Sequence, residues 1–168
     1  MRRWMAAYIR VVDKINYRVG RFIMYGIFAM MAVLLWSSIS KTFFLPSLWT
    51  LEIAQFLMVG YYILGGAYSI QLGSNVRMDL FYANWSDRRK AAFDTATVFM
   101  LLFYLGVLLY GGFESTIYSL EYGERSPTAW RPYIWPIKIV MCLGIVMMLL
   151  QAVSELFKDI LKLKSEAA

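Results

Sequence analysis

Two acidic residues within apolar stretches are the side chains of this sequence that could most readily carry chemistry. Glu52 and Glu114 lie in the second and third of four long apolar segments. An ionisable group in such a segment is by default a candidate for proton or cation coupling. Both lie near one end of their segment, whereas coupled carriers normally keep their site at the midplane. The sequence therefore favours structural carboxylates, wetted at the interface or paired with Lys41, Arg125, Arg131 or Lys138.

The residue types that dominate enzyme active sites are scarce. The chain has no histidine and a single cysteine, Cys142, which lies in an apolar segment. The lack of histidine excludes bis-histidine haem, ordinary zinc sites and histidine bases, and one thiol cannot run an internal disulfide relay. We expect no catalytic residue, no metal site and no cofactor, and we expect that the protein is not an enzyme.

Composition places the chain in a membrane. Of its 168 residues, 60% are hydrophobic and 17% are charged, against about 45–50% and about 25% in a soluble domain. About twenty apolar residues suffice for a helix to cross the hydrocarbon core. The sequence predicts an all-α integral membrane protein with one domain over residues 1–168, and four spans at about 22–44, 50–72, 91–118 and 136–157.

Residues 1–20 have the pattern of an amphipathic helix. The apolar side chains Trp4, Tyr8, Val11, Val12, Ile15 and Val19 recur at helical spacing, and basic residues lie on the other face. This pattern predicts a helix on the membrane surface, although a cytosolic tail with chance periodicity would look similar. The side chains predicted to contact anionic lipid headgroups are Arg3, Arg10, Lys14 and Arg18.

The distribution of Lys and Arg predicts the orientation. Four spans put both termini on one side, and that side has 13 of the 17 Lys and Arg residues, while the other has 4. Because basic residues concentrate on the cytoplasmic side, both termini and the 74–90 connection are predicted to be cytoplasmic. Membrane lipid is then the partner of the positive charge, and nucleic acid is not.

Small residues recur in the second span. Gly65, Ser69 and Gly73 are spaced by four, so one helix face lacks bulk. In lipid such a face usually packs closely against another helix. The sequence leaves open whether that helix belongs to this chain or to a partner.

Several motifs, taken in order along the chain, resemble a known family. The second span and its exit contain Trp49-x-x-Glu52, Leu64-Gly65-Gly66-Ala67-Tyr68 and Gly73-x-Asn75-Val76-Arg77-Met78-Asp79, and the outer loop contains Gly123-Glu124-x-Ser126-Pro127 and Trp130-x-Pro132-x-x-Trp135-Pro136-x-Lys138. The chain resembles the small, DctQ-like membrane subunit of the tripartite ATP-independent periplasmic (TRAP) transporters. Its exit motif matches that of the family, which has His or Asn at this position, with Asn75 in place of His.

The resemblance implies a non-catalytic subunit of a sodium-coupled system in the bacterial inner membrane that takes up organic acids. Its partners would be a large membrane subunit, which holds the substrate and sodium sites, and a periplasmic substrate-binding protein. Residues expected at assembly interfaces are Trp49, Glu52, Gly65, Ser69, Gly73, Asp79, Trp130 and Arg131.

Two other functions compete with this one. A self-sufficient four-helix transporter, acting as a homodimer, would need Glu52 or Glu114 as its membrane carboxylate. A membrane-embedded redox or lipid enzyme would need histidines, paired cysteines or a clustered acidic motif, and the sequence has none of them. Substrate identity cannot be read from this chain.

Overall fold

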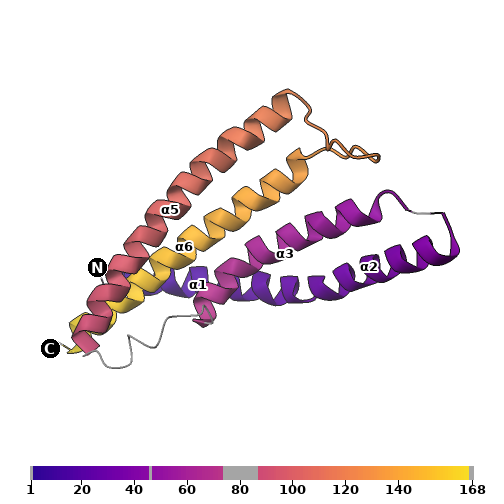
Figure 1. Cartoon of the computed structure of the whole chain (residues 1–168). Coiled ribbons are helices and arrows are strands. Elements are labelled where there is room, and N and C mark those ends of the chain that lie inside the picture. The colour runs from indigo at the N-terminus through magenta and orange to yellow at the C-terminus, as the bar shows by residue number, and fades with distance from the viewer. Residues whose placement is uncertain (1, 46, 74–86, 167–168) are drawn as a thin grey trace.

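Five long helices make up most of the chain in the computed structural model, which describes residues 2–45, 47–73 and 87–166 (Figure 1). They are α1 (Arg2–Met24), α2 (Gly26–Phe43), α3 (Thr50–Leu72), α5 (Asp87–Glu121) and α6 (Trp135–Glu166). Four segments are long and apolar enough to cross a membrane, namely Trp4–Phe43, Thr50–Leu72, Thr97–Glu121 and Trp135–Lys158. The predicted all-α class with four spans is confirmed.

Several helices begin or end outside the predicted spans, because a helix can continue past the apolar residues from which a span is predicted. The first helical break lies at Tyr25, so Phe22, the predicted start of the first span, lies near the end of α1, and the apolar segment Trp4–Phe43 continues across the break. Tight bonds from the N–H of Tyr25 to the Phe22 carbonyl (3.2 Å) and from the N–H of Phe28 to the Tyr25 carbonyl (3.1 Å) form the turn. α5 begins at Asp87, before the predicted start at 91, and α6 continues to Glu166, past 157. Apolar runs mark the hydrocarbon core, whereas these helices continue beyond it.

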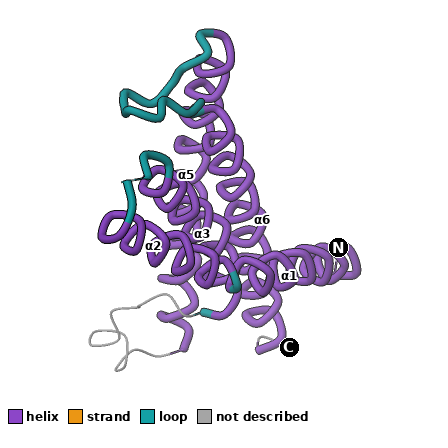
Figure 2. Tube along the Cα trace, turned by 90° about the vertical axis from the view of Figure 1, so that its right-hand side faces the viewer, coloured by secondary structure: helices purple, strands orange, loops and turns teal. Residues whose placement is uncertain are grey.

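The four membrane-crossing helices form a row. α3 packs against α2 on one side and α6 on the other, and α6 also packs against α5. Figure 1 shows the α2–α3 and α5–α6 hairpins splayed apart at the end that bears the two connecting loops. α1 contacts α3 and α6, and Figure 2 shows it running across the row at a large angle to α6.

Glycines allow α3 and α6 to approach closely. A Cβ atom on Gly66 would lie 2.7 Å from Sδ of Met148, and one on Gly144 would lie 3.1 Å from the carbonyl carbon of Ile63. With alanine at these positions, the Met148 side chain would have to move and the backbone of α3 at Ile63 would have to shift by a few tenths of an ångström. Van der Waals packing of this kind is a main source of helix association in lipid.

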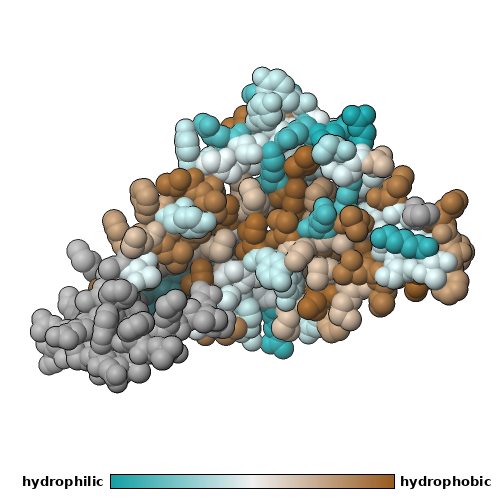
Figure 3. All heavy atoms as spheres, viewed as in Figure 1, coloured by the Kyte–Doolittle hydropathy of each residue, from teal (hydrophilic) through white to brown (hydrophobic). Residues whose placement is uncertain are grey.

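The interior of the row is small. Among the described residues, the fully buried apolar side chains are Val12, Ala54, Ala67, Leu105, Ile145 and Ala152, and many large apolar side chains are exposed. Figure 3 shows apolar residues covering the helices, with hydrophilic residues gathered near the α5–α6 loop. So much exposed apolar surface requires lipid or another protein to cover it.

Candidate functional site

Glu52 is the most unusual polar group among the predicted site residues. It lies in the first turn of α3 and is only 5% exposed. Neither carboxylate oxygen has a hydrogen-bond partner among the described residues. The described residues therefore supply no ion-pair partner for Glu52, and its role as a wetted or paired carboxylate stays a prediction. Lys138, a predicted partner, instead pairs with Glu124, because the loop places that carboxylate within 2.8 Å of its ammonium.

The second candidate acid, Glu114, lies on the surface of α5. Its carboxylate accepts a hydrogen bond from the Tyr110 hydroxyl, 3.0 Å away and one helical turn earlier. The local partner explains why this acid is tolerated in an apolar helix. Neither Glu52 nor Glu114 joins another acid in a cluster, and the described residues hold no group of His, Cys, Asp and Glu that could bind a metal.

A salt bridge anchors the loop between α5 and α6. The ammonium of Lys138 lies 2.8 Å from Oε2 of Glu124 and 2.5 Å from the hydroxyl of Ser119, and it also donates to the Ser115 carbonyl at 3.3 Å. Ser119 donates to the same Glu124 oxygen and is fully buried. These contacts tie the start of the loop to both helices.

Beyond this anchor the loop closes as a short hairpin. The amide of Ser126 donates to the Pro132 carbonyl (2.9 Å), and the amide of Ile134 donates to the Glu124 carbonyl (3.1 Å). The guanidinium of Arg125 stacks over the Tyr133 ring, 4.2 Å from its centre. The hairpin presents the predicted interface residues Trp130 and Arg131, both exposed, at its far end.

Arg131 has an unusual backbone conformation at the turn of the hairpin. Its φ of 49° lies in the left-handed region, which residues other than glycine, asparagine and aspartate seldom adopt. Strain of this kind persists where the surrounding structure imposes it and often accompanies function. Trp49, the other predicted aromatic, is the N-cap residue of α3 and is 38% exposed, and its side chain makes no capping bond.

A cluster of polar side chains at the other end of α6 was not predicted from the sequence. Asp13 of α1 accepts hydrogen bonds from Gln151 (3.0 Å) and Ser154 (3.1 Å) on Oδ1, and its Oδ2 lies 2.8 Å from the ammonium of Lys158. Asn16 donates to Gln151 at 2.6 Å, and both are buried. These contacts hold α1 against α6.

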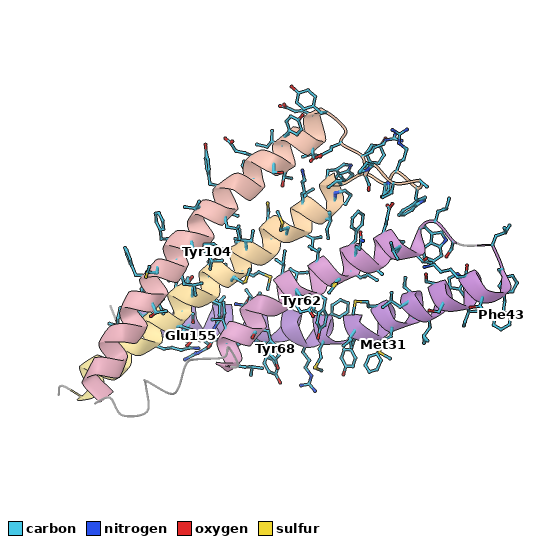
Figure 4. All side chains as sticks on the ribbon, viewed as in Figure 1. Met31, Phe43, Tyr62, Tyr68, Tyr104 and Glu155 are labelled. Carbon is cyan, nitrogen blue, oxygen red and sulfur yellow. The ribbon has the colours of Figure 1, made fainter. Side chains whose placement is uncertain are left out.

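The same cluster reaches α3 and extends along α6. The amide of Gln71 donates to the Asp13 backbone carbonyl at 3.0 Å, so α3 joins the attachment of α1. Glu155 accepts from Gln151 and lies 2.8 Å from Lys158. Figure 4 places Glu155 where α6 passes α1. The signal in the sequence was the lone acid of a basic helix together with glutamines inside apolar spans.

The glycines of the predicted small-residue row have different structural roles. An added Cβ on Gly65 would meet no atom within 4 Å, so this glycine serves no close contact inside the chain. Gly73 has φ of 61° and ends α3, which gives it a conformational reason to be glycine. Asp79 and the side chain of Arg3 lie outside the described residues.

Gly65 and Ser69 line a groove between α1 and α3. Its volume is about 460 Å³, and its walls are Gly20, Ile23 and Met24 of α1 with Tyr61, Tyr62, Gly65, Gly66, Tyr68, Ser69 and Leu72 of α3. Most of these side chains are apolar or aromatic. The groove is long enough along α3 to receive side chains of a neighbouring helix or lipid.

Replacing Asp13 tests the inner cluster. In Asp13→Ala, Gln151, Ser154 and Lys158 lose their shared acceptor, and we expect the free energy of unfolding to fall by about 1–3 kcal/mol. Thermal unfolding in mild detergent measures this change. Glu114→Ala, which removes an exposed acid, is the matched control and should change stability little. Equal losses in the two variants would contradict the structural role of Asp13.

The salt bridge of the outer hairpin predicts its pH dependence. Hydrogen bonds from Lys138 first, and then from Ser119, lower the pKa of the Glu124 carboxyl. A lowered pKa means that the contact stabilises the hairpin fully above the ordinary glutamate range and is lost as the pH falls through the lowered value. Hydrogen exchange, corrected for intrinsic rates, should show the Ser126 and Ile134 amides protected at neutral pH and exposed only in acid.

Two variants distinguish the loss of the Glu124 salt bridge from other effects of low pH on the protein. Glu124→Gln should lose amide protection already at neutral pH, and Glu121→Gln, which alters an exposed acid outside the hairpin, should not. If protection in Glu124→Gln matches the natural chain at every pH, the salt bridge does not hold the hairpin.

Glu52→Gln tests whether the buried carboxylate has a partner inside the chain. Because burying an unpaired charge is unfavourable, removal of the charge should leave the melting temperature of the purified chain unchanged or raise its free energy of unfolding by about 1 kcal/mol. A clear loss of stability in the isolated chain would show that an internal partner exists.

Comparison with known families supplies a further observation. Residues 30–162 match the family model described as tripartite ATP-independent periplasmic transporters, DctQ component. A comparison with curated proteins gave no match. The matched range contains α3, α5, most of α2 and α6, and all of the predicted interface residues. The chain therefore belongs to the DctQ family, and it is the small, multi-pass membrane component of a TRAP transporter.

Proposed function

We propose that this chain is the fixed scaffold for the large membrane subunit of a sodium-coupled transporter that takes up organic acids. The observation that carries the proposal is the open groove at Gly65 beside a row of helices with a small interior. The described helices leave much apolar surface uncovered, and such a surface is suited to assembly with a partner. Transport chemistry then belongs to the larger partner.

The groove between α1 and α3 is the proposed seat of a helix of the large subunit. Gly65 offers backbone without a side chain, and no atom of this chain would contact a Cβ added there. Close approach of helix backbones at small residues favours association in lipid. The nearby glycines Gly20 and Gly66 already face Tyr68 and Met148 within the chain, which leaves Gly65 for a partner.

The outer hairpin is the proposed contact for the periplasmic binding protein. It is anchored by Lys138 and Glu124 and presents Trp130 and Arg131 on a closed loop. Tryptophan and arginine are among the side chains that most often dominate interface energies. A loop held in one conformation also loses less entropy on binding than a loose one.

The proposed orientation puts both termini in the cytoplasm of a bacterium with this chain in its inner membrane. The basic residues of the termini and of the 74–90 connection favour that side. α1 then lies along the inner surface of the membrane. Its side chains Trp4, Val11 and Ile15 are exposed in the isolated chain and would enter the lipid, while Lys14 and Arg18 face headgroups.

Gly65→Leu tests the scaffold role. A Cβ atom at this position meets no atom within 4 Å, so we expect the chain to remain folded, while the leucine side chain in the groove would hold a partner helix away. We expect affinity purification in mild detergent to lose most of the co-purifying large subunit, and uptake should fall with it. Gly106→Leu is the matched control, because Gly106 of α5 is also open and lies outside the groove.

Two results would contradict the scaffold proposal. One is full assembly and uptake in Gly65→Leu, which would show that the groove holds no partner helix. The other is purification of the natural chain as a lone dimer that transports by itself, which would favour the self-sufficient carrier.

Trp130→Ala and Arg131→Ala test the docking of the binding protein. Both residues are exposed, so assembly with the large subunit should persist. We expect uptake at low binding-protein concentration to fall on the order of tenfold, because the loss of one important interface side chain often weakens binding by this much. High concentrations should restore uptake. A loss that is equal at every concentration would exclude docking as the cause.

A further inference from the structure

A second groove lies on the opposite face of α1. It has a volume of about 450 Å³ and is formed by Lys14, Tyr17, Arg18, Arg21, Phe22 and Tyr25. All six side chains are exposed, and their spacing places them along one face of the helix. Three cations and three aromatic rings therefore share a shallow surface just before the chain turns from α1 into α2.

Among the residues that the structure describes, no acidic side chain lies in this groove to offset its positive charge. Asp13 is the single acidic residue before Glu52, and its carboxylate is bound to Lys158, Gln151 and Ser154 on the inner side of α1. No groove-lining residue is an acid. The chain thus directs its one nearby carboxylate away from the groove and leaves the positive field there intact.

The groove also offers ordered donors beside an apolar edge. Arg21 donates to the Tyr17 hydroxyl at 3.2 Å, which holds its guanidinium along the groove. Guanidinium and ammonium groups are the usual donors to phosphate oxygens. Phe22 is 79% exposed and borders these charges, and Ile15, at 52%, lies on the adjoining apolar face. Tyrosine is typical of the lipid headgroup layer, because its ring is apolar and its hydroxyl group can be hydrated.

We propose that this groove binds one anionic phospholipid molecule, with its phosphate on Lys14, Arg18 and Arg21 and its acyl chains beside Phe22. The inference rests on the proposed position of α1 at the inner membrane surface. The inference goes further than that position. Diffuse attraction of anionic lipids along the whole basic face of α1 would have no fixed stoichiometry, whereas this groove would bind one lipid molecule. The bound lipid fixes α1 at the level where α2 enters the membrane.

Native mass spectrometry of the full chain in detergent tests the proposal. We would titrate phosphatidylglycerol and phosphatidylcholine separately and count the retained molecules. We expect one tightly retained phosphatidylglycerol and no comparable phosphatidylcholine. Arg18→Gln and Arg21→Gln should each weaken retention about fivefold. Arg10→Gln is the matched control, since Arg10 is exposed on the same helix but does not line the groove.

Three outcomes would overturn the proposal. Equal weakening by Arg10→Gln and Arg18→Gln would indicate diffuse attraction. Equal retention of the two lipids would show that the charge is not recognised. Displacement of phosphatidylglycerol by millimolar inorganic phosphate would indicate a free-anion site. None of these depends on the large subunit, whose co-purification with the same chain separately tests the scaffold role.

Discussion

The close contact between α3 and α6 is the constraint on which the rest of the structure depends. It joins the α2–α3 hairpin to the α5–α6 hairpin, and it forms because Gly66 and Gly144 leave room for Met148 and Ile63. Hydrophobicity alone cannot hold helices together in lipid, since lipid tails are as apolar as the side chains. Larger residues at these two positions would force α3 and α6 to repack, and α1 contacts both of these helices.

Polar contacts then set the position of α6 in the membrane. Lys138 and Lys158 are each bound to carboxylates, and twenty residues separate them, which is about 30 Å of helix and close to the thickness of the hydrocarbon core. One cluster anchors the outer hairpin, and the other attaches α1. Polar groups therefore concentrate at both ends of α6 and leave its middle apolar. This arrangement is consistent with the proposed scaffold role.

The sequence predicted the four spans well because apolar length is a local property. It predicted the helix ends less well, since α5 and α6 extend beyond the apolar runs and α1 passes Phe22 before it turns. It also missed the contact of Asp13 with Gln151, two residues far apart in the chain that only the packing of α1 on α6 brings together. The burial of Glu52 was likewise unpredictable, because depth along a helix does not reveal which face its neighbours cover.

The central claim is that the groove between α1 and α3 receives the large subunit, and photo-crosslinking in cells tests it most directly. A photoreactive amino acid in place of Tyr62, which is exposed and lines the groove, can be compared with one in place of Tyr104, which is equally exposed on α5 (Figure 4). The scaffold account predicts a strong crosslink from position 62 to the large subunit and a much weaker one from position 104. Crosslinks from position 62 only to lipid or to a second copy of this chain would contradict it.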